Sequence, residues 1–293
     1  MIPRILIIAG SDSGGGAGIQ ADVKTVTMLG GHAMTAITAL TAQNTLGVDG
    51  VMPVPAEFVV AQIDAVLSDL GADAVKIGMI GSAETAHAVA DRLASLEVPI
   101  VFDPVMVATS GAALADEETI AAFGRLMKLS SVTTPNRLEL EALSGCAIEN
   151  EIAQAVAAEA AMLATGCTAI LAKGGHWPGG EIRQGTLAGE ERRYSTDGHL
   201  FDHLYMVDAD GWQDICWHHE RIETRHTHGT GCTLASGIAT GLGRGLSLPD
   251  AIGAARDYLL AALGAAPGFG AGHGPMGHAL GGVPFDLIHN KSG

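Results

Sequence analysis

The segment HTHGTGC, residues 226–232, places two glycines and a thiol at the expected start of a helix. The free N–H groups of a first helical turn carry partial positive charge and can hold an anion. Gly229 and Gly231 let the backbone approach an oxyanion without a Cβ in the way. The helix dipole is also expected to lower the pKa of the Cys232 thiol. The segment therefore predicts a phosphate-binding turn beside a nucleophile or base, although a tight turn before a core helix with a buried cysteine explains the same residues.

Hard oxygen ligands follow two of the expected strands. Asp103 ends the apolar run at residues 99–102, and Asn136 and Glu139 follow the run at 132–134. Carboxylate and amide oxygens suit Mg²⁺ held partly through water, as in phosphoryl transfer. Asn136 and Glu139 also have the spacing of a helix capping box. The two roles can coexist.

Lysines end two other apolar runs in a chain that has few cations. Lys173 follows residues 169–172, where a purely structural charge would be costly, so contact with phosphate is favoured. Lys76 has the same type of position, with less support from its neighbours. We expect phosphate contact from both.

A glycine-rich loop at residues 14–18 follows the first strand and precedes a helix. It can offer backbone N–H groups to a ligand or simply permit a sharp turn. Ligand contact is favoured because Gln20 and Asp22 follow on the helix, with Asp22 expected on the substrate side. Asp12 could accept hydrogen bonds from a substrate, but aspartate is also a common turn residue.

The other sequence patterns do not indicate a nucleotide-binding or metal-binding site. There is no GxxxxGK[ST] motif, and the GxGxxG string at 272–277 has a proline inside and no strand before it, so it is treated as chance. The histidines at 218, 219, 226 and 228 do not form a convincing metal set and are expected in open loops.

Strands and helices alternate along most of the chain, which predicts an α/β fold: a mostly parallel central sheet with helices on both faces, forming one domain over residues 1–293. Residues 177–225 are expected to form a small antiparallel edge region, and 264–293 a Gly/Pro-rich tail. The strands are expected at 4–9, 33–40, 74–77, 99–103, 132–134 and 169–173. The helices are expected at 19–24, 56–68, 83–96, on each side of residue 145, and at 233–242 and 249–263.

The formal charge of −16 argues against nucleic acid or an anionic membrane as a partner, because both need a basic surface. The four cysteines are widely spaced and form no CxxC pair, which fits a reducing cytoplasm. No signal peptide or membrane span is expected.

The motifs together resemble the hydroxymethylpyrimidine/phosphomethylpyrimidine kinases of thiamine biosynthesis, within the ribokinase superfamily. The resemblance runs almost from end to end. It rests on the segments GSDSGGGAGIQAD (10–22), ALTAQNTLGV (39–48), KIGM (76–79), FDPVMVATSG (102–111), TPNRLELEAL (134–143), KGGH (173–176) and THGTGCTLASGIA (227–239).

This resemblance implies ATP-dependent phosphorylation of 4-amino-5-hydroxymethyl-2-methylpyrimidine, first to the monophosphate and then to the diphosphate. By motif match, Gln43 would bind the pyrimidine and Ala17 would contact it through its backbone. Cys232 would deprotonate or orient the hydroxymethyl oxygen. The remaining implied roles are an anion hole (Gly229, Thr230, Gly231, with Cys232), Mg²⁺ and phosphate organisation (Asp103, Glu139), and contact with the phosphates of ATP (Lys173, Asn136).

A homodimer is expected at the level of the family. Two other readings stay open. A pyridoxine or pyridoxal kinase shares the fold and a similar turn, although the segment carrying Gln43 favours the pyrimidine. A catalytically silent pyrimidine sensor would not need Cys232, Lys173, Asp103 and Glu139 together. The stretch 177–201 looks longer than in the family, which leaves its local topology and the dimer edge open.

Overall fold

Strand β1 (Arg4–Asp12) is buried on both faces of a central sheet. Ile5 and Ile7 pack into one apolar cluster, and Leu6 and Ile8 pack into another. Successive side chains of a strand point to opposite faces, so a continuous apolar run means that both faces are covered. The computed structural model of the chain describes residues 1–107, 111, 113–175, 182–187, 190–195, 198–209 and 211–282.

The main sheet has nine strands over the described residues, in the order β11-β10-β7-β6-β5-β4-β1-β2-β3. Strands β1, β2, β4, β5, β6 and β7 pair in parallel, whereas β3, β10 and β11 are antiparallel. The bounds are β2 (His32–Gln43), β3 (Val48–Pro53), β4 (Ala74–Ile77), β5 (Ile100–Phe102), β6 (Val132–Thr133), β7 (Ala169–Gly175), β10 (His199–Asp208) and β11 (Gly211–Glu220). The expected mostly parallel sheet with an antiparallel edge is confirmed.

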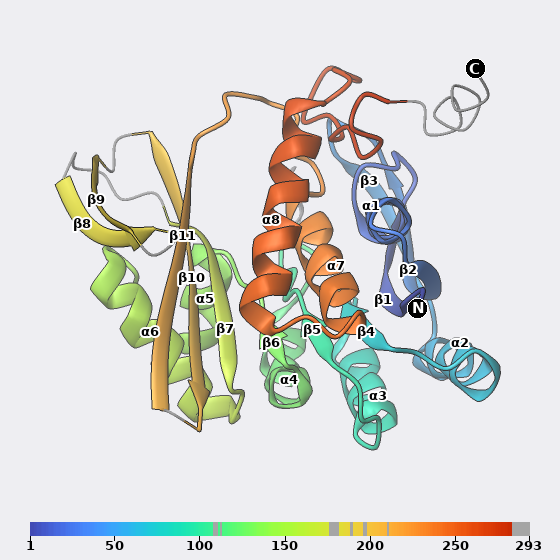
Figure 1. Cartoon of the computed structure of the whole chain (residues 1–293). Helices are drawn as coiled ribbons and strands as arrows, with labels where there is room; N and C mark the ends of the chain where they lie inside the picture. Colours follow the sequence, from blue (N-terminus) through green and yellow to red (C-terminus); the bar gives the residue numbers. More distant parts are fainter. Residues whose placement is uncertain are drawn as a thin grey trace.

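Helices cover both faces of the sheet (Figure 1). One face carries α1 (Gly18–Met28), α7 (Thr230–Gly243) and α8 (Leu248–Gly264), whose buried side chains belong to the same apolar cluster as Ile5 and Ile7. The other face carries α2 (Ala56–Asp69), α3 (Ala83–Leu93), α4 (Glu117–Leu129), α5 (Arg137–Ser144) and α6 (Glu151–Thr165).

Local sequence signals explain most helix ends. The side chains of Ser82, Asp116, Asn150 and Ser247 accept hydrogen bonds from the first turns of α3, α4, α6 and α8. These bonds satisfy N–H groups that otherwise have no partner within the helix. Helix α7 has no such side-chain cap, because its N-cap residue is Gly229. Its first turn is therefore left available for another acceptor.

The antiparallel region differs from the expectation in two respects. Strands β10 and β11 lie at one sheet edge as expected, but β8 (Ile182–Leu187) and β9 (Glu190–Ser195) form a separate two-stranded sheet. Strand β3 makes a second antiparallel edge that the sequence pattern did not indicate.

Residues 265–282 contain turns and no helix or strand, and 283–293 lie outside the described residues, so a single domain over 1–293 stays a prediction. None of the helices described is long and apolar enough to span a membrane.

Candidate active site

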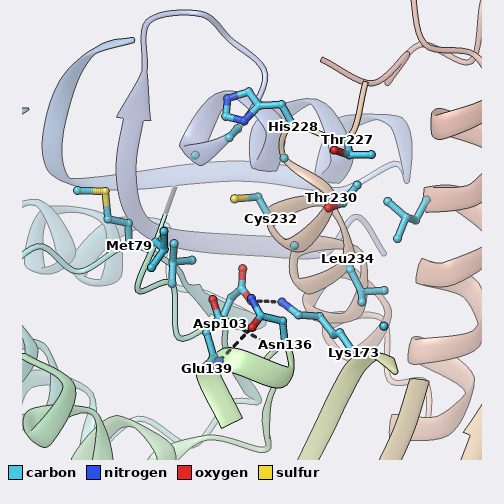
Figure 2. A pocket seen from close by; sticks show the side chains of 18 of the residues that line it. Met79, Asp103, Asn136, Glu139, Lys173, Thr227, His228, Thr230, Cys232 and Leu234 are labelled. Carbon is cyan, nitrogen blue, oxygen red and sulfur yellow. Dashed lines mark hydrogen bonds and ion pairs between the residues drawn. The ribbon is translucent and has the colours of Figure 1, made fainter. Parts of the chain in front are cut away.

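A cavity of about 830 Å³ opens where the parallel strands end. Ligands of open α/β sheets bind beyond the carboxyl ends of the strands, and this cavity has that position. Its polar lining comes from the ends of β1, β2, β5 and β7, from the start of α5 and from the turn before α7 (Figure 2). The lining includes most of the expected site residues: Ala17, Gln43, Lys76, Asp103, Asn136, Glu139, Lys173 and Gly229 to Cys232.

Asp103 and Lys173 form an ion pair on the floor of the cavity. Lys173 Nζ lies 2.7 Å from Oδ1 of Asp103, and the hydroxyl of Thr134 donates to the same oxygen at 2.9 Å. Burial alone would raise the pKa of Asp103, but the nearby ammonium of Lys173, with that of Lys76, outweighs burial and lowers it. Asp103 is therefore ionised, and Lys173 brings a cation to the edge of the cavity.

Glu139 lies beside this pair as part of a capping box. Its Oε2 accepts from the backbone N–H of Asn136 at 2.8 Å, and Oδ1 of Asn136 accepts from the N–H of Glu139 at 3.0 Å. Burial raises the pKa of Glu139 to about 7; Lys173 opposes this rise and the charge of Asp103 adds to it. The capping box confirms the second of the two roles considered for these residues.

These two carboxylates fit a divalent cation. Asp103 and Glu139 are both buried and each disfavours ionisation of the other, a conflict that an added positive charge relieves. Within the described residues no group of three or more His, Cys, Asp or Glu side chains gathers as a metal site. Mg²⁺ suits a two-carboxylate site, because it usually keeps several waters and shares phosphate oxygens with a substrate.

The first turn of α7 lies directly against the Asp103–Lys173 pair. A Cβ built on Gly231 would be 3.1 Å from Oδ2 of Asp103 and 3.2 Å from Nζ of Lys173. Gly229 has a φ of +87°, and a Cβ there would be 2.0 Å from the carbonyl oxygen of Gly16. Glycine is thus required at Gly229, whereas a Cβ at Gly231 would crowd the ion pair and make its side chains shift. The uncapped N–H groups of this turn are available to an anion beside the lysine.

Cys232 lies in the same turn, between the pair and the imidazole of His228 (Figure 2). The expected lowering of its thiol pKa is wrong. Burial raises the pKa of Cys232 to about 11, and the nearby ammonium of Lys76 only partly opposes this. Desolvation outweighs the nearby cation here, so the thiol is neutral near pH 7.

The first glycine loop is organised by Asp12. Its carboxylate accepts from the backbone N–H groups of Gly14, Gly16 and Ala17 at 2.7, 3.0 and 2.9 Å. Asp12 is 3% exposed, so it shapes the turn from inside. Ala17 lines the cavity as expected.

His228 is a site residue that the sequence patterns missed. The expectation of an open-loop histidine is wrong: His228 is 7% exposed, and its Nε2 lies 2.9 Å from Oδ2 of Asp12. The side-chain amide of Gln43 lies 3.3 Å from the same ring nitrogen. Because the Asp12 carboxylate only accepts, Nε2 of His228 donates to it, and the Gln43 amide is a close polar neighbour of the same ring; His228 thus brings the glycine loop, the end of β2 and the turn before α7 together. Its position directly before Gly229 was the available signal.

Asp22 and Lys76 behave differently from the sequence expectation. Both carboxylate oxygens of Asp22 contact Nζ of Lys76, at 3.0 and 2.8 Å, and Ser236 Oγ donates to Asp22 at 2.7 Å. Both charged side chains are 0% exposed. Asp22 is fully engaged and does not line the cavity, so direct substrate contact is wrong for this geometry. Lys76 borders the cavity, but its ammonium is held by Asp22 rather than presented to a phosphate.

The far wall of the cavity was also missed. It combines apolar and polar side chains from β10, β11, the loop after it and α8: Leu200, Asp202, His219, Arg221, Ile222, Thr224, Leu259 and Leu263. This wall lies beyond Lys173 and suits a flat heterocyclic base. Most of it comes from residues 200–224, a polar stretch without a recognisable motif, which is why residue patterns did not find it.

Proteins similar to this chain in sequence are named as kinases. The sequence model of the family described as phosphomethylpyrimidine kinase matches residues 12–277. A hydroxymethylpyrimidine/phosphomethylpyrimidine kinase of Rhizobium meliloti (strain 1021) is 46% identical, over 93% of this chain and 96% of that protein. The protein of the same name from Bacillus subtilis (strain 168) is 40% identical, over 94% and 95%.

Solved structures agree on the fold. Bacillus subtilis pyridoxal kinase, in an ADP complex, has a TM-score of 0.80 at 28% identity, over 96% of this chain and 98% of that one. A phosphomethylpyrimidine kinase from Clostridium difficile 630 has a TM-score of 0.70 at 33% identity, over 89% and 98%. The ribokinase-like fold and the resemblance of the motifs are thus both confirmed. The chain belongs to the hydroxymethylpyrimidine/phosphomethylpyrimidine kinase family, the phosphotransferases of thiamine biosynthesis.

Proposed function

We propose that this chain transfers the γ-phosphoryl group of ATP to the hydroxymethyl group of 4-amino-5-hydroxymethyl-2-methylpyrimidine, and then a second phosphoryl group to the monophosphate. The observation that carries the proposal is the position of the α7 turn. It lies between a phosphate side, Asp103 and Lys173, and an acceptor side, Gln43 and His228. A kinase needs this arrangement because donor and acceptor must meet at one point.

On the phosphate side, the chain supplies charge that is already in place. Lys173 contacts the phosphates of ATP, and the backbone N–H groups from Gly229 to Cys232 bind the transferred group. Phosphoryl transfer depends mainly on positioning and electrostatic stabilisation, so fixed donors in a partly enclosed cavity contribute strongly. Asn136 holds Glu139 in place through the capping box and borders the same phosphates.

On the acceptor side, Gln43 offers both a donor and an acceptor, which matches a ring nitrogen next to an exocyclic amine. Ala17 contributes its backbone beside the ring. Cys232 orients the hydroxymethyl oxygen toward the phosphate. A loose transition state does not require early removal of the hydroxyl proton, so a neutral thiol is sufficient for this role.

Asp103 and Glu139 would hold Mg²⁺ between the enzyme and the phosphates. The ion would neutralise charge that develops on the phosphoryl oxygens. Replacing Asp103 by Asn should therefore raise the Mg²⁺ concentration needed for half-maximal activity. An unchanged Mg²⁺ requirement would remove the metal role of this residue.

The test of function is a coupled ADP-release assay with three acceptors: hydroxymethylpyrimidine, its monophosphate and pyridoxal. We expect turnover of both pyrimidines and a diphosphate end product. Pyridoxal is the second candidate, because pyridoxal kinases of Bacillus subtilis and Staphylococcus aureus superpose with TM-scores of 0.80 and 0.79. Turnover of pyridoxal without either pyrimidine would overturn the main proposal. ATP binding without turnover of any acceptor would favour the sensor.

We further propose a cytoplasmic location and, from the resemblance to the family alone, a homodimer. The cysteines are unpaired over the described residues and no helix there could span a membrane. Sedimentation analysis at micromolar concentration tests the assembly, and a monomer would contradict it. Fractionation of expressing cells tests the location, and recovery outside the cytoplasmic fraction would contradict it.

A further inference from the structure

A glycine-rich segment after α8 packs on the acceptor side of the cavity. We call residues 268–278, GFGAGHGPMGH, the strap. Its residue Gly272 presses on Thr45, two residues after Gln43: a Cβ on Gly272 would be 2.0 Å from the carbonyl oxygen of Thr45. The backbone N–H of His273 donates to that oxygen at 3.0 Å, and the N–H of Gly272 donates to Thr45 Oγ1 at 3.3 Å.

The same strap holds the segment that leads into the α7 turn. The backbone N–H of His228 donates to the carbonyl oxygen of Gly274 at 3.3 Å. Nδ1 of His273 lies 3.2 Å from the carbonyl oxygen of Arg225. A Cβ on Gly274 would be 2.3 Å from Nδ1 of His226, so only glycine allows this approach. The strap therefore contacts both segments that meet in the cavity.

The far end of the strap is anchored beneath α7 and α8. His278 is 5% exposed, and its Nε2 lies 3.0 Å from the hydroxyl of Thr233, the residue after Cys232. The hydroxyl of Tyr258 donates to the carbonyl oxygen of His278 at 2.8 Å. Gly277 packs against the end of α8, where a Cβ would be 2.0 Å from the carbonyl oxygen of Ala265. These contacts fix the strap relative to the helix that carries the α7 turn.

We propose that the strap is a positioning element, which sets the distance between the acceptor-binding residue Gln43 and the phosphate-transfer turn at Cys232. The glycines of the GxGxxG string at 272–277 allow the backbone of the strap to pack directly against the backbone of neighbouring segments. The proposal rests on the proposed function, because it names what the strap positions. It differs from a general folding role because the contacts converge on two cavity segments, residues 44–46 and 225–228.

Gly272→Ala tests the strap, because a methyl group there meets a backbone oxygen that no side-chain rotation can move. We expect the KM for hydroxymethylpyrimidine to rise at least tenfold while the KM for ATP changes less than twofold. Hydrogen exchange should rise in peptides covering 43–47 and 224–231. The matched control is Gly264→Ala, at the end of α8, where a Cβ meets nothing within 4 Å. It should keep both KM values and the exchange pattern.

A milder pair of variants covers the case in which Gly272→Ala does not fold. Thr45→Ala removes the acceptor for the Gly272 N–H, and Thr45→Ser keeps it. We expect the acceptor KM to be higher in Thr45→Ala and to return to the wild-type value in Thr45→Ser.

The outcomes separate the two proposals. If the wild-type enzyme turns over no pyrimidine, the proposed function fails, and hydrogen exchange still decides whether the strap orders the two segments. The strap proposal is wrong if the wild type is active and both variants, Gly272→Ala and Thr45→Ala, keep its KM values and its hydrogen-exchange pattern. Equal rises in both KM values together with a lower Tm would also overturn it, because they indicate a general loss of structure.

Discussion

The imidazole of His228 lies 2.9 Å from the carboxylate of Asp12, across 216 residues of sequence. Because Asp12 also organises the glycine loop, His228→Ala should loosen that loop and leave the amide of Gln43 without its neighbour. A hydrogen bond to a charged group contributes about 1.5–3 kcal/mol. Because that ordering of the loop must then be supplied when the acceptor binds, we expect the acceptor KM to rise by roughly tenfold to a hundredfold. Steady-state kinetics with hydroxymethylpyrimidine measure this.

The control for His228 is His32→Ala, because His32 is exposed and lies at the start of β2. It should leave the acceptor KM unchanged. If both variants behave as the wild type, the contacts of His228 with Asp12 and Gln43 do not position the acceptor.

The thiol of Cys232 should resist alkylation at neutral pH. Burial raises its pKa to about 11, so at pH 8 only about one thiol in a thousand is ionised. We expect the rate of carbamidomethylation, followed by mass spectrometry, to increase with pH without a plateau below pH 10. A plateau near pH 8 would show that the helix dipole and Lys76 dominate after all.

Cys232→Ala separates binding from transfer at the same position. We expect transfer to be largely abolished while isothermal titration still detects hydroxymethylpyrimidine, because Gln43 and the glycine loop are unchanged. The variant Cys146→Ala serves as the control, because Cys146 does not line the cavity. Unchanged turnover in Cys232→Ala would remove its proposed role.

Sequence patterns were most informative where one residue type meets a local backbone requirement. Apolar runs ending on Asp103 and Lys173 predicted strand ends, and Gly229 and Gly231 predicted a turn open to an anion. Strand β3 escaped prediction because five of its six residues are exposed, so it shows no alternation of buried and exposed positions. Its existence depends on pairing with β2, a contact that no local pattern encodes.

Pairings between distant residues account for the other misses. Lys76 and Asp22 each looked available for a ligand, and neither residue alone reveals that the two neutralise each other. His228 looked like a loop residue because its partner, Asp12, lies near the other end of the chain. The pKa of Cys232 was misjudged because desolvation depends on the whole fold, whereas the helix dipole can be inferred locally.

The buried pair of Lys76 and Asp22 should be a stability element. Burial alone would lower the pKa of Lys76, but the charge of Asp22 outweighs it and raises the pKa, so the ammonium stays protonated. Asp22→Asn leaves that charge without a counter-ion and should reduce the free energy of unfolding by about 3–5 kcal/mol. The double variant Asp22→Leu/Lys76→Met should recover most of this loss. Urea unfolding measures both.

The exposed pair of Asp91 and Arg125 provides the control, and Asp91→Asn should change the stability little. If Asp22 instead contacted the substrate directly, Asp22→Asn would raise the acceptor KM with little loss of stability. That result would contradict the structural role.

His203 should make the stability depend on pH in the neutral to alkaline range. Its imidazole is 3% exposed, with Nδ1 3.0 Å from Asp214 and Nε2 3.4 Å from Glu151. Burial alone would lower the pKa of His203, but the hydrogen bond to Asp214 and the contact with Cys216 outweigh it and raise the pKa to about 9. A pKa raised on folding stabilises the protein fully below about pH 6.5, the unfolded value. The stabilisation is then lost as the pH rises toward 9.

Urea unfolding at pH 6, 7.5 and 9.5 should show this decline in stability in the wild type, and a smaller decline in Asp214→Asn. Asp49→Asn, at an exposed position in β3, should follow the wild type. Parallel profiles for the wild type and Asp214→Asn would mean that His203 does not carry the raised pKa.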